Sequence, residues 1–217
     1  MGSSLTVGTA RARVLHLLGS LAQGFTNAEI DQTLRRALEE YTRAGLDPNS
    51  PIRPRIKVDV LTPTNGTREQ SLSALTGLIG VQRVWFPYTA NSEPQWIDFE
   101  VWWTDGAPVL FLSNTAGDGS SAARVYWYAP QTLNGLDAAN ATTFDARDEN
   151  LLLTGAAGYL CAQRASGPNA KAYLVLASQF GSDFQRALEP TRKVVSARVR
   201  NAGSDLTFYD PNTLEMR

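Results

Sequence analysis

The chain has 217 residues, with 20 Lys and Arg against 21 Asp and Glu, one His, one Cys and a formal net charge of −1. This balance of charge argues against a strongly basic nucleic-acid-binding protein. A single Cys cannot form an internal disulfide, and with a single His it cannot supply the ligands of a Cys/His zinc site. An apolar fraction of 43% with 19% charged residues is typical of a folded globular protein.

The first fifty residues predict two short helices. Apolar residues recur at helical spacing through residues 9–23, and Gly24 is placed for a left-handed C-cap. Thr26 then forms a capping box with Glu29 at the start of a second amphipathic helix, which is expected to end before Gly45. Residues 1–10 lack the pattern of a secretory signal, and no stretch of 18 residues is uninterruptedly apolar, so we expect no membrane partner.

Between Pro51 and Pro130 the pattern changes to short runs of β-branched and aromatic residues separated by turn residues. Strands are expected at residues 56–61, 81–86, 96–103, 109–112 and 123–128. In the third strand, alternation predicts one fully apolar face, made of Ile97, Phe99, Val101 and Trp103. Asp105-Gly106 predicts a tight hairpin turn, and residues 70–80 suggest a helical turn.

After Pro130 the helical pattern returns. Thr143 or Asp145 can cap a helix whose small residues at 155–158 would allow close contact with another helix. A last helix is expected to begin at Pro168 and to end before Pro190. Residues 191–217 read as an extended arm.

These elements predict an α+β protein: a helical bundle formed by the N- and C-terminal helices, with an inserted, aromatic-rich antiparallel β domain and an extended C-terminal arm. The expected boundaries are 1–50 for the N-terminal helices, 51–130 for the β domain, 131–190 for the C-terminal helices and 191–217 for the arm.

Few residues offer catalytic chemistry. His16 lies beside Leu17-Leu18 in the first helix, where a structural or surface role is expected rather than that of a general base. Cys161 lies in an apolar helix, and we expect a buried, unreactive thiol. The Gly-rich residues 117–121 lack the Lys of a phosphate-binding loop and predict a hairpin loop. We therefore expect no enzymatic activity, no metal and no cofactor.

Paired carboxylates would be the other route to catalysis, as in glycosidases. The candidates are Asp98, Glu100, Asp105, Asp145, Asp148 and Glu149. A structural role is the preferred interpretation, because the first two are expected on the solvent face of a strand and the last three at a helix N-terminus, where negative charge is favourable.

All five Trp residues, at 85, 96, 102, 103 and 127, fall within 44 residues together with Phe86, Tyr88, Phe99, Phe111, Tyr126 and Tyr128. One small sheet cannot hide so many aromatic rings on a single face. Two interpretations stay open: a two-layer sandwich uses the rings as its core, or some rings are exposed for contact with sugar, nucleic acid or protein.

Several short motifs follow one another in a recognisable order. They are Glu39-Glu40-Tyr41 in the second helix, V-x-x-V-W-F-P at 81–87, a Trp-rich strand, P-V-L-F-L at 108–112, R-V-Y-W-Y-A-P-Q-T-L at 124–133, Asp137, Thr142-Thr143 and D-E-N-L-L-L-T-G-A-A-G-Y-L at 148–160. This order, over residues 25–188, resembles the head-to-tail adaptor proteins of tailed bacteriophages, also called head completion or connector proteins.

The resemblance implies a non-catalytic virion protein of the neck, the head-to-tail interface, produced in the cytoplasm of a bacterial host. It implies a homo-oligomeric ring, commonly a dodecamer, between the portal protein and the tail or further neck proteins. Such a ring extends the DNA channel, and DNA passes through its lumen without specific binding.

In resembling proteins the C-terminal segment commonly docks onto the portal. The portal-docking candidates in this chain are Arg192, Lys193, Arg198, Arg200, Phe208 and Tyr209. Two alternatives stay open. One is another structural or assembly protein of a virion, and the other is a carbohydrate- or receptor-binding β module with an aromatic platform, in which Trp96 and Trp102 would be the contact residues.

Overall fold

The computed structural model describes residues 2–113, 116–166 and 168–189. The helices are α1 (Val7–Leu18), α2 (Asn27–Ala44), α3 (Glu149–Gln163) and α4 (Ala170–Leu188), with 3-10 turns η1 (Gly19–Leu21) and η2 (Ala146–Asp148). The strands are β1 (Arg55–Leu61), β2 (Glu69–Ser71), β3 (Gly80–Tyr88), β4 (Trp96–Ile97), β5 (Phe99–Thr104), β6 (Ala107–Leu112) and β7 (Ala122–Ala129). The expected α+β class is confirmed, and the expected arm lies outside the described residues.

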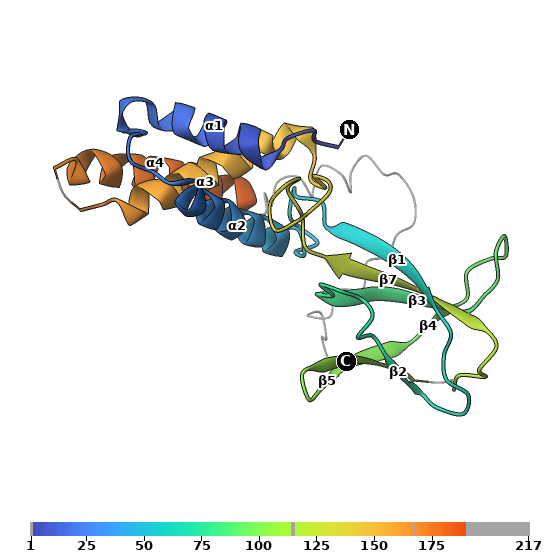
Figure 1. The fold of residues 1–217 in the computed structure, drawn as a ribbon. Helices are drawn as coiled ribbons and strands as arrows, with labels where there is room; N and C mark the ends of the chain where they lie inside the picture. Colours follow the sequence, from blue (N-terminus) through green and yellow to red (C-terminus); the bar gives the residue numbers. More distant parts are fainter. Residues whose placement is uncertain (1, 114–115, 167, 190–217) are drawn as a thin grey trace, which may run out of the picture.

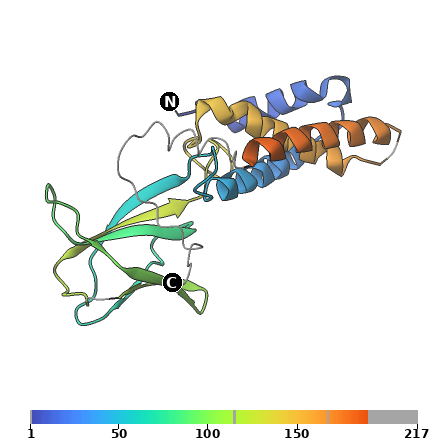
Figure 2. The same cartoon turned by 180° about the vertical axis from the view of Figure 1, so that it is seen from behind.

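Helices from both ends of the chain share one apolar core, with α3 in contact with α1, α2 and α4 (Figures 1 and 2). We call α1 to α4 and the segment 130–148 the helical unit. The predicted capping box at the start of α2 is confirmed, since Thr26 Oγ1 accepts from the Glu29 N–H and the Glu29 carboxylate accepts from the Thr26 N–H. The α2 residues Ile30 and Leu34 are fully buried in this core.

Small residues let α3 and α4 pack closely. A Cβ atom added to Gly155 would lie 2.8 Å from the ring of Phe184, and one added to Gly158 would lie 3.1 Å from the backbone nitrogen of Gly181. The glycines of α3 are therefore required by the approach of α4, as the run of small residues predicts.

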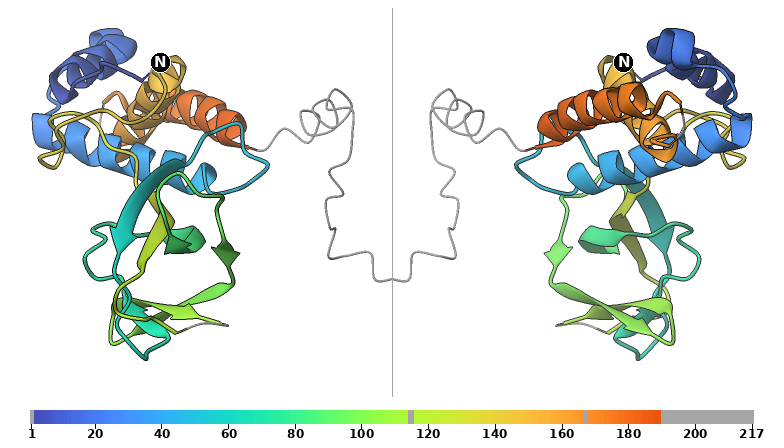
Figure 3. Two further views of the ribbon diagram at one scale, coloured as in Figure 1. Left: turned by 90° about the vertical axis from the view of Figure 1, so that its right-hand side faces the viewer. Right: turned by 90° about the vertical axis from the view of Figure 1, so that its left-hand side faces the viewer.

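The strands form two antiparallel sheets, one of four strands in the order β1-β7-β3-β4 and one of three in the order β2-β6-β5. A second apolar core lies between them, and includes Leu110, Leu112, Val84, Val125 and Trp127. The two sheets are therefore the layers of a sandwich, which we call the β unit. Figures 1 and 2 show it at one end of the helical unit, and Figure 3 shows it on the side where α2 lies.

Two sequence-based expectations in the β unit are wrong. Residues 70–80 are not helical, because Glu69–Ser71 pair with β6 and the following residues form turns. The expected strand at 96–103 is divided at Asp98, where the chain leaves the four-stranded sheet and enters the three-stranded one. Alternation continues across the break, so the pattern alone could not reveal it. The turn at Asp105-Gly106 is confirmed, with φ of 51° and 79°.

The apolar face predicted for that strand is only partly covered. Ile97, Phe99 and Val101 pack against the sandwich core, but Trp103 is 59% exposed, because it lies next to the hairpin turn at the end of the strand. Helix ends also differ: α1 stops at Leu18 rather than at residue 23, and α4 begins at Ala170 rather than at Pro168.

The N-terminal segment is fixed to α3 by one carboxylate. Glu149 accepts hydrogen bonds from Ser3 Oγ and from Arg13 Nη1, each at 2.7 Å. These two donors, Ser3 first, lower the pKa of Glu149 below its ordinary value.

Substitution of Glu149 tests this contact through the pH dependence of stability. A lowered pKa in the folded state means that the carboxylate stabilises the fold above its ordinary pKa and that this contribution is lost as pH falls through the lowered value. We expect Glu149→Gln to reduce the loss of stability between neutral and acidic pH, measured by urea unfolding. Glu39→Gln, at an exposed carboxylate of α2, is the control and should keep the wild-type pH dependence. Equal slopes for wild type and Glu149→Gln would contradict this expectation.

A pair of glycine substitutions tests the packing of α3 against α4. Gly155→Ala should lower the free energy of unfolding by about 1–3 kcal/mol, because the new methyl group meets the Phe184 ring. Gly181→Ala meets open space and should raise it by about 0.5–1 kcal/mol through helix propensity. Chemical denaturation of both variants measures the difference, and stabilisation by both would show that the contact is not tight.

Candidate functional site

The two units meet where the chain enters and leaves the β unit. Arg55, the first residue of β1, is the register partner of Ala129, the last residue of β7, so the two crossings lie side by side. Arg55 Nη1 also donates to the carbonyl of Pro130 at 2.8 Å. We call residues 52–55 and 129–143, together with the C-terminal half of α2, the junction.

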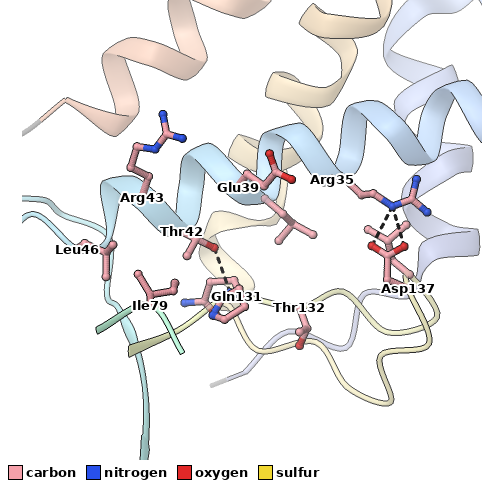
Figure 4. Close-up of a pocket in the computed structure, with 12 residues that line it drawn as sticks. Arg35, Glu39, Thr42, Arg43, Leu46, Ile79, Gln131, Thr132 and Asp137 are labelled. Atoms are coloured by element: carbon pink, nitrogen blue, oxygen red, sulfur yellow. Dashed lines mark hydrogen bonds and ion pairs between the residues drawn. The ribbon is translucent and has the colours of Figure 1, made fainter. Parts of the chain in front are cut away.

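Gln131 is the centre of the junction and is 8% exposed. Its backbone N–H donates to Thr42 Oγ1 of α2 at 3.0 Å (Figure 4). Its side-chain Nε2 donates to the Arg53 carbonyl, and its Oε1 accepts from Thr143 Oγ1 at 2.8 Å. The residue therefore binds α2, the segment before β1 and the segment before η2 at once. Because Gln131 is buried, its own backbone N–H and side-chain amide would otherwise lack hydrogen-bond partners.

The segment after Gln131 folds back on the helical unit. Leu133 and Leu136 are buried in the helical core, and Asn134 N–H donates to Thr142 Oγ1. Asp137 has a φ of 50°, a conformation that Asp tolerates better than most residues. Its carboxylate accepts from Arg35 Nε of α2 at 2.7 and 2.9 Å (Figure 4).

A groove follows the junction between α2 and this segment (Figure 4). Arg35, Glu39 and Arg43, one helical turn apart, form one wall, while Ile79 and Leu46 add apolar surface. The lining alternates charges and contains no Ser, Cys or His that could act as a nucleophile or base.

Inside the helical unit, the Tyr41 hydroxyl donates to Asp148 Oδ2 at 2.6 Å. Burial raises the pKa of Tyr41 strongly, and the bond to Asp148 raises it further, so the phenol stays protonated. Tyr41 is 1% exposed, and its ring meets that of Phe144 edge to face. This contact connects α2 to the start of the C-terminal helices.

The outer face of the four-stranded sheet, which points away from the sandwich core, is apolar and exposed. Register pairs Ile56, Val58 and Val60 of β1 with Tyr128, Tyr126 and Arg124 of β7 on this face. All three β1 side chains are more than 40% exposed. A row of exposed β-branched residues at a sheet edge is unusual for a monomer.

Aromatic rings and two arginines cover the rest of this outer face. The Arg83 guanidinium lies 4.4 Å from the Trp96 ring and 4.7 Å from the Tyr126 ring, and Arg124 lies over Tyr88 and Tyr126. Such stacking holds both cations against the face while their charge stays in water. Beneath them Trp85 is buried, and its Nε1 has no hydrogen-bond partner among the described residues.

The outer face of the three-stranded sheet carries the opposite charge. Trp102 stacks on Phe111 with ring centroids 4.5 Å apart and donates from Nε1 to Glu100. Register places Glu69 and Glu100 on either side of Phe111, and both are exposed. Two carboxylates and a stacked aromatic pair therefore define this face.

The two predicted contact residues of the β unit are not brought together. Trp96 lies on the outer face of the four-stranded sheet and Trp102 on that of the three-stranded sheet, 45% and 40% exposed. The aromatic residues divide between both interpretations left open above, since Trp127 and Phe86 are core residues while Trp96, Trp102 and Trp103 are exposed. The predicted portal-docking residues, from Arg192 to Tyr209, lie outside the described residues.

The remaining candidates occupy structural positions. His16 is exposed on α1, Cys161 is buried in α3 with its pKa raised to about 11 by that burial, and Asp145 caps η2. Asp118 accepts from Ser121 Oγ and from two backbone N–H groups, which lowers its pKa to about 2 and fixes the loop before β7.

Within the described ranges, no group of three or more His, Cys, Asp or Glu side chains is arranged to hold a metal ion. In the same part of the chain no helix is long and apolar enough to cross a membrane.

The junction is the feature that analysis of separate motifs missed. Gln131, Thr142 and Thr143 belong to motifs quoted above, but nothing in their spacing reveals their contacts. The one sequence feature that could have indicated the junction is the pair of polar residues, Gln131 and Thr132, that comes directly after the last strand and Pro130. Polar side chains at such a point can supply the hydrogen-bond partners that a buried backbone needs.

No protein-family model matches the sequence, and no curated protein matches it. Among solved structures, a chain described as "Virion of native gene transfer agent (GTA) particle" is 15% identical, with a TM-score of 0.30. The match covers 83% of this chain and 93% of that chain. A score at this level carries no argument about fold or function.

Gln131→Ala tests whether the junction couples the two units. All five Trp residues lie in the β unit, so Trp fluorescence reports its unfolding, while far-UV circular dichroism reports mainly the helices. We expect coincident transitions for the wild type. Gln131→Ala keeps the backbone hydrogen bond to Thr42 but removes both side-chain hydrogen bonds. It should lower the free energy of unfolding by about 1–3 kcal/mol in total and separate the two transitions.

Gln179→Ala, at an exposed position of α4, is the matched control and should leave the transitions coincident. If wild-type transitions are already separate, or if Gln131→Ala behaves as the control does, the junction does not couple the units.

Proposed function

We propose that this chain is a structural protein of a tailed-phage-like virion, a head-to-tail adaptor that forms a ring between portal and tail and extends the DNA channel. It acts by binding its own copies, the portal and the next neck or tail component, without enzymatic chemistry. DNA passes through the lumen without specific binding, in keeping with a net charge of −1.

One observation carries the proposal: residues on which the resemblance to adaptors rests meet in space. Tyr41 and Asp148 come from motifs 107 positions apart and share a hydrogen bond. Gln131 and Thr143, from two other motifs, also bond to each other. Motif residues that bond to one another within the helical unit and at its junction support a shared architecture better than scattered surface residues would.

The surfaces of the β unit support an assembly role as well. Its outer faces expose β-branched and aromatic side chains, with Val60 55% exposed. Surface of this kind marks contact with another protein more often than it occurs on a free monomer.

The alternative of a carbohydrate-binding module needs neighbouring exposed rings that form one platform. Trp96 and Trp102 lie on different sheets, and the ring of Trp102 is already stacked on Phe111. This arrangement favours an assembly protein over a sugar-binding platform.

The proposal is tested with the portal protein encoded by the same genome. The full chain mixed with purified portal rings should give a second, coaxial ring in negative-stain images. A chain truncated after Pro190 should fold with unchanged circular dichroism and lose portal binding, because residues 191–217 carry the expected docking segment. Failure of the full chain to associate with portal rings would contradict the adaptor role.

Two point variants separate the kinds of contact that the arm makes. If Tyr209→Ala weakens binding at both low and high salt, the contact is apolar. If Arg198→Ala weakens binding only at low salt, the contact is ionic. Unchanged portal binding by the truncated chain would remove the docking role from the arm while leaving the ring itself in place.

A further inference from the structure

The β unit presents two opposite surfaces to its surroundings. Because the two sheets are the layers of one sandwich, their outer faces point in opposite directions. We call the outer face of the four-stranded sheet the cationic face and that of the three-stranded sheet the anionic face. Two different surfaces on opposite sides of one unit are what head-to-tail packing of identical copies requires.

The cationic face has two charged groups of one sign. The outward residues of β1, β7, β3 and β4, as the register gives them, include Arg83 and Arg124 and no carboxylate within this described sheet. Around the arginines lie the exposed Ile56, Val58 and Val60. The unpartnered Nε1 of Trp85 adds a buried donor on this side of the sheet.

The anionic face has the matching composition. The outward residues of β2, β6 and β5 include Glu69 and Glu100 and, among the described residues of this sheet, no Lys or Arg. Exposed Trp102, stacked on the partly buried Phe111, provides flat apolar area between the carboxylates. Arginine stacked on aromatic rings is well suited to a carboxylate partner, because its guanidinium presents a fork of N–H donors.

We propose that copies of this chain pack head to tail through the β unit, with the cationic face of one copy against the anionic face of the next. This inference rests on the proposed function and names the contact that builds the ring. The occupant of each face is therefore a second copy of this chain. Arg83 and Arg124 meet Glu69 and Glu100, while β-branched and aromatic side chains fill the area between them.

Other occupants account for the surfaces less well. Pairing of two like faces would bring arginines against arginines or carboxylates against carboxylates, which is unfavourable. The basic residues 192–200 of the same chain could cover the anionic face only, and would leave the apolar cationic face exposed. A neighbouring copy covers both faces at once, and a heterologous contact that closes on itself gives a ring.

Charge reversal tests the contact with full-length chains. Variant one carries Arg83→Glu and Arg124→Glu, so both of its faces are acidic, and variant two carries Glu69→Lys and Glu100→Lys, so both of its faces are basic. The wild type should form oligomers larger than dimers in sedimentation velocity. Each variant alone should self-associate at least about a hundredfold more weakly.

An equimolar mixture of the two variants should regain assembly, because acidic faces of one then meet basic faces of the other in alternation. The control is Lys171→Glu with Arg186→Glu, at two exposed cations of α4. It changes the net charge as variant one does and should assemble like the wild type. Variant two alters only exposed side chains, so its loss of assembly is decisive even if variant one folds poorly.

Three outcomes would overturn the inference: a monomeric wild type at the highest soluble concentration, unchanged assembly of variant two, or loss of self-association on truncation after Pro190. If the variants still form rings on the portal, the adaptor role stands and this contact is wrong. If the mixture rescues assembly but no copy binds the portal, this contact stands and the adaptor role is wrong.

Discussion

The buried amide of Gln131 is the interaction on which the arrangement of this molecule depends. An inserted β unit is connected to its host helices by two chain crossings, and two flexible crossings would leave its orientation undefined. Here the two crossings are strand ends, Arg55 and Ala129, that pair with each other. Two residues after Ala129, Gln131 binds α2, the segment before β1 and the segment before η2. The groove beside it is lined from both units, by α2 with the segment after Gln131 and by Ile79, which precedes β3.

A fixed orientation matters because the β unit acts through the surfaces that it exposes. Its core uses only the inner faces of the two sheets. Further aromatic residues lie on the outer faces, with arginines stacked over Trp96, Tyr88 and Tyr126 of the four-stranded sheet. A sandwich that is held rigidly and exposes two surfaces of opposite charge can be repeated side by side, which is the geometry that a ring of copies requires.

Much of this fold follows from local signals. The capping box at Thr26, the hairpin turn at Asp105-Gly106 and the small residues facing α4 are each decided by neighbours in sequence or by the size of one side chain. The break at Asp98 is not local, because alternation of apolar residues is the same in one strand as in two strands of different sheets. The role of Gln131 is not local either, because its hydrogen-bond partners lie 12, 78 and 89 positions away in the sequence.

The central claim is that this chain is a ring component whose copies meet through the two outer faces of the β unit. A cryo-electron microscopy map of the assembled neck is the most direct measurement of that claim. The account predicts density of one β unit against the next, with Arg83 and Arg124 within ion-pair distance of Glu69 and Glu100 of the neighbouring copy. A ring in which both outer faces are open to solvent, or in which neighbours meet only through helices, would contradict it.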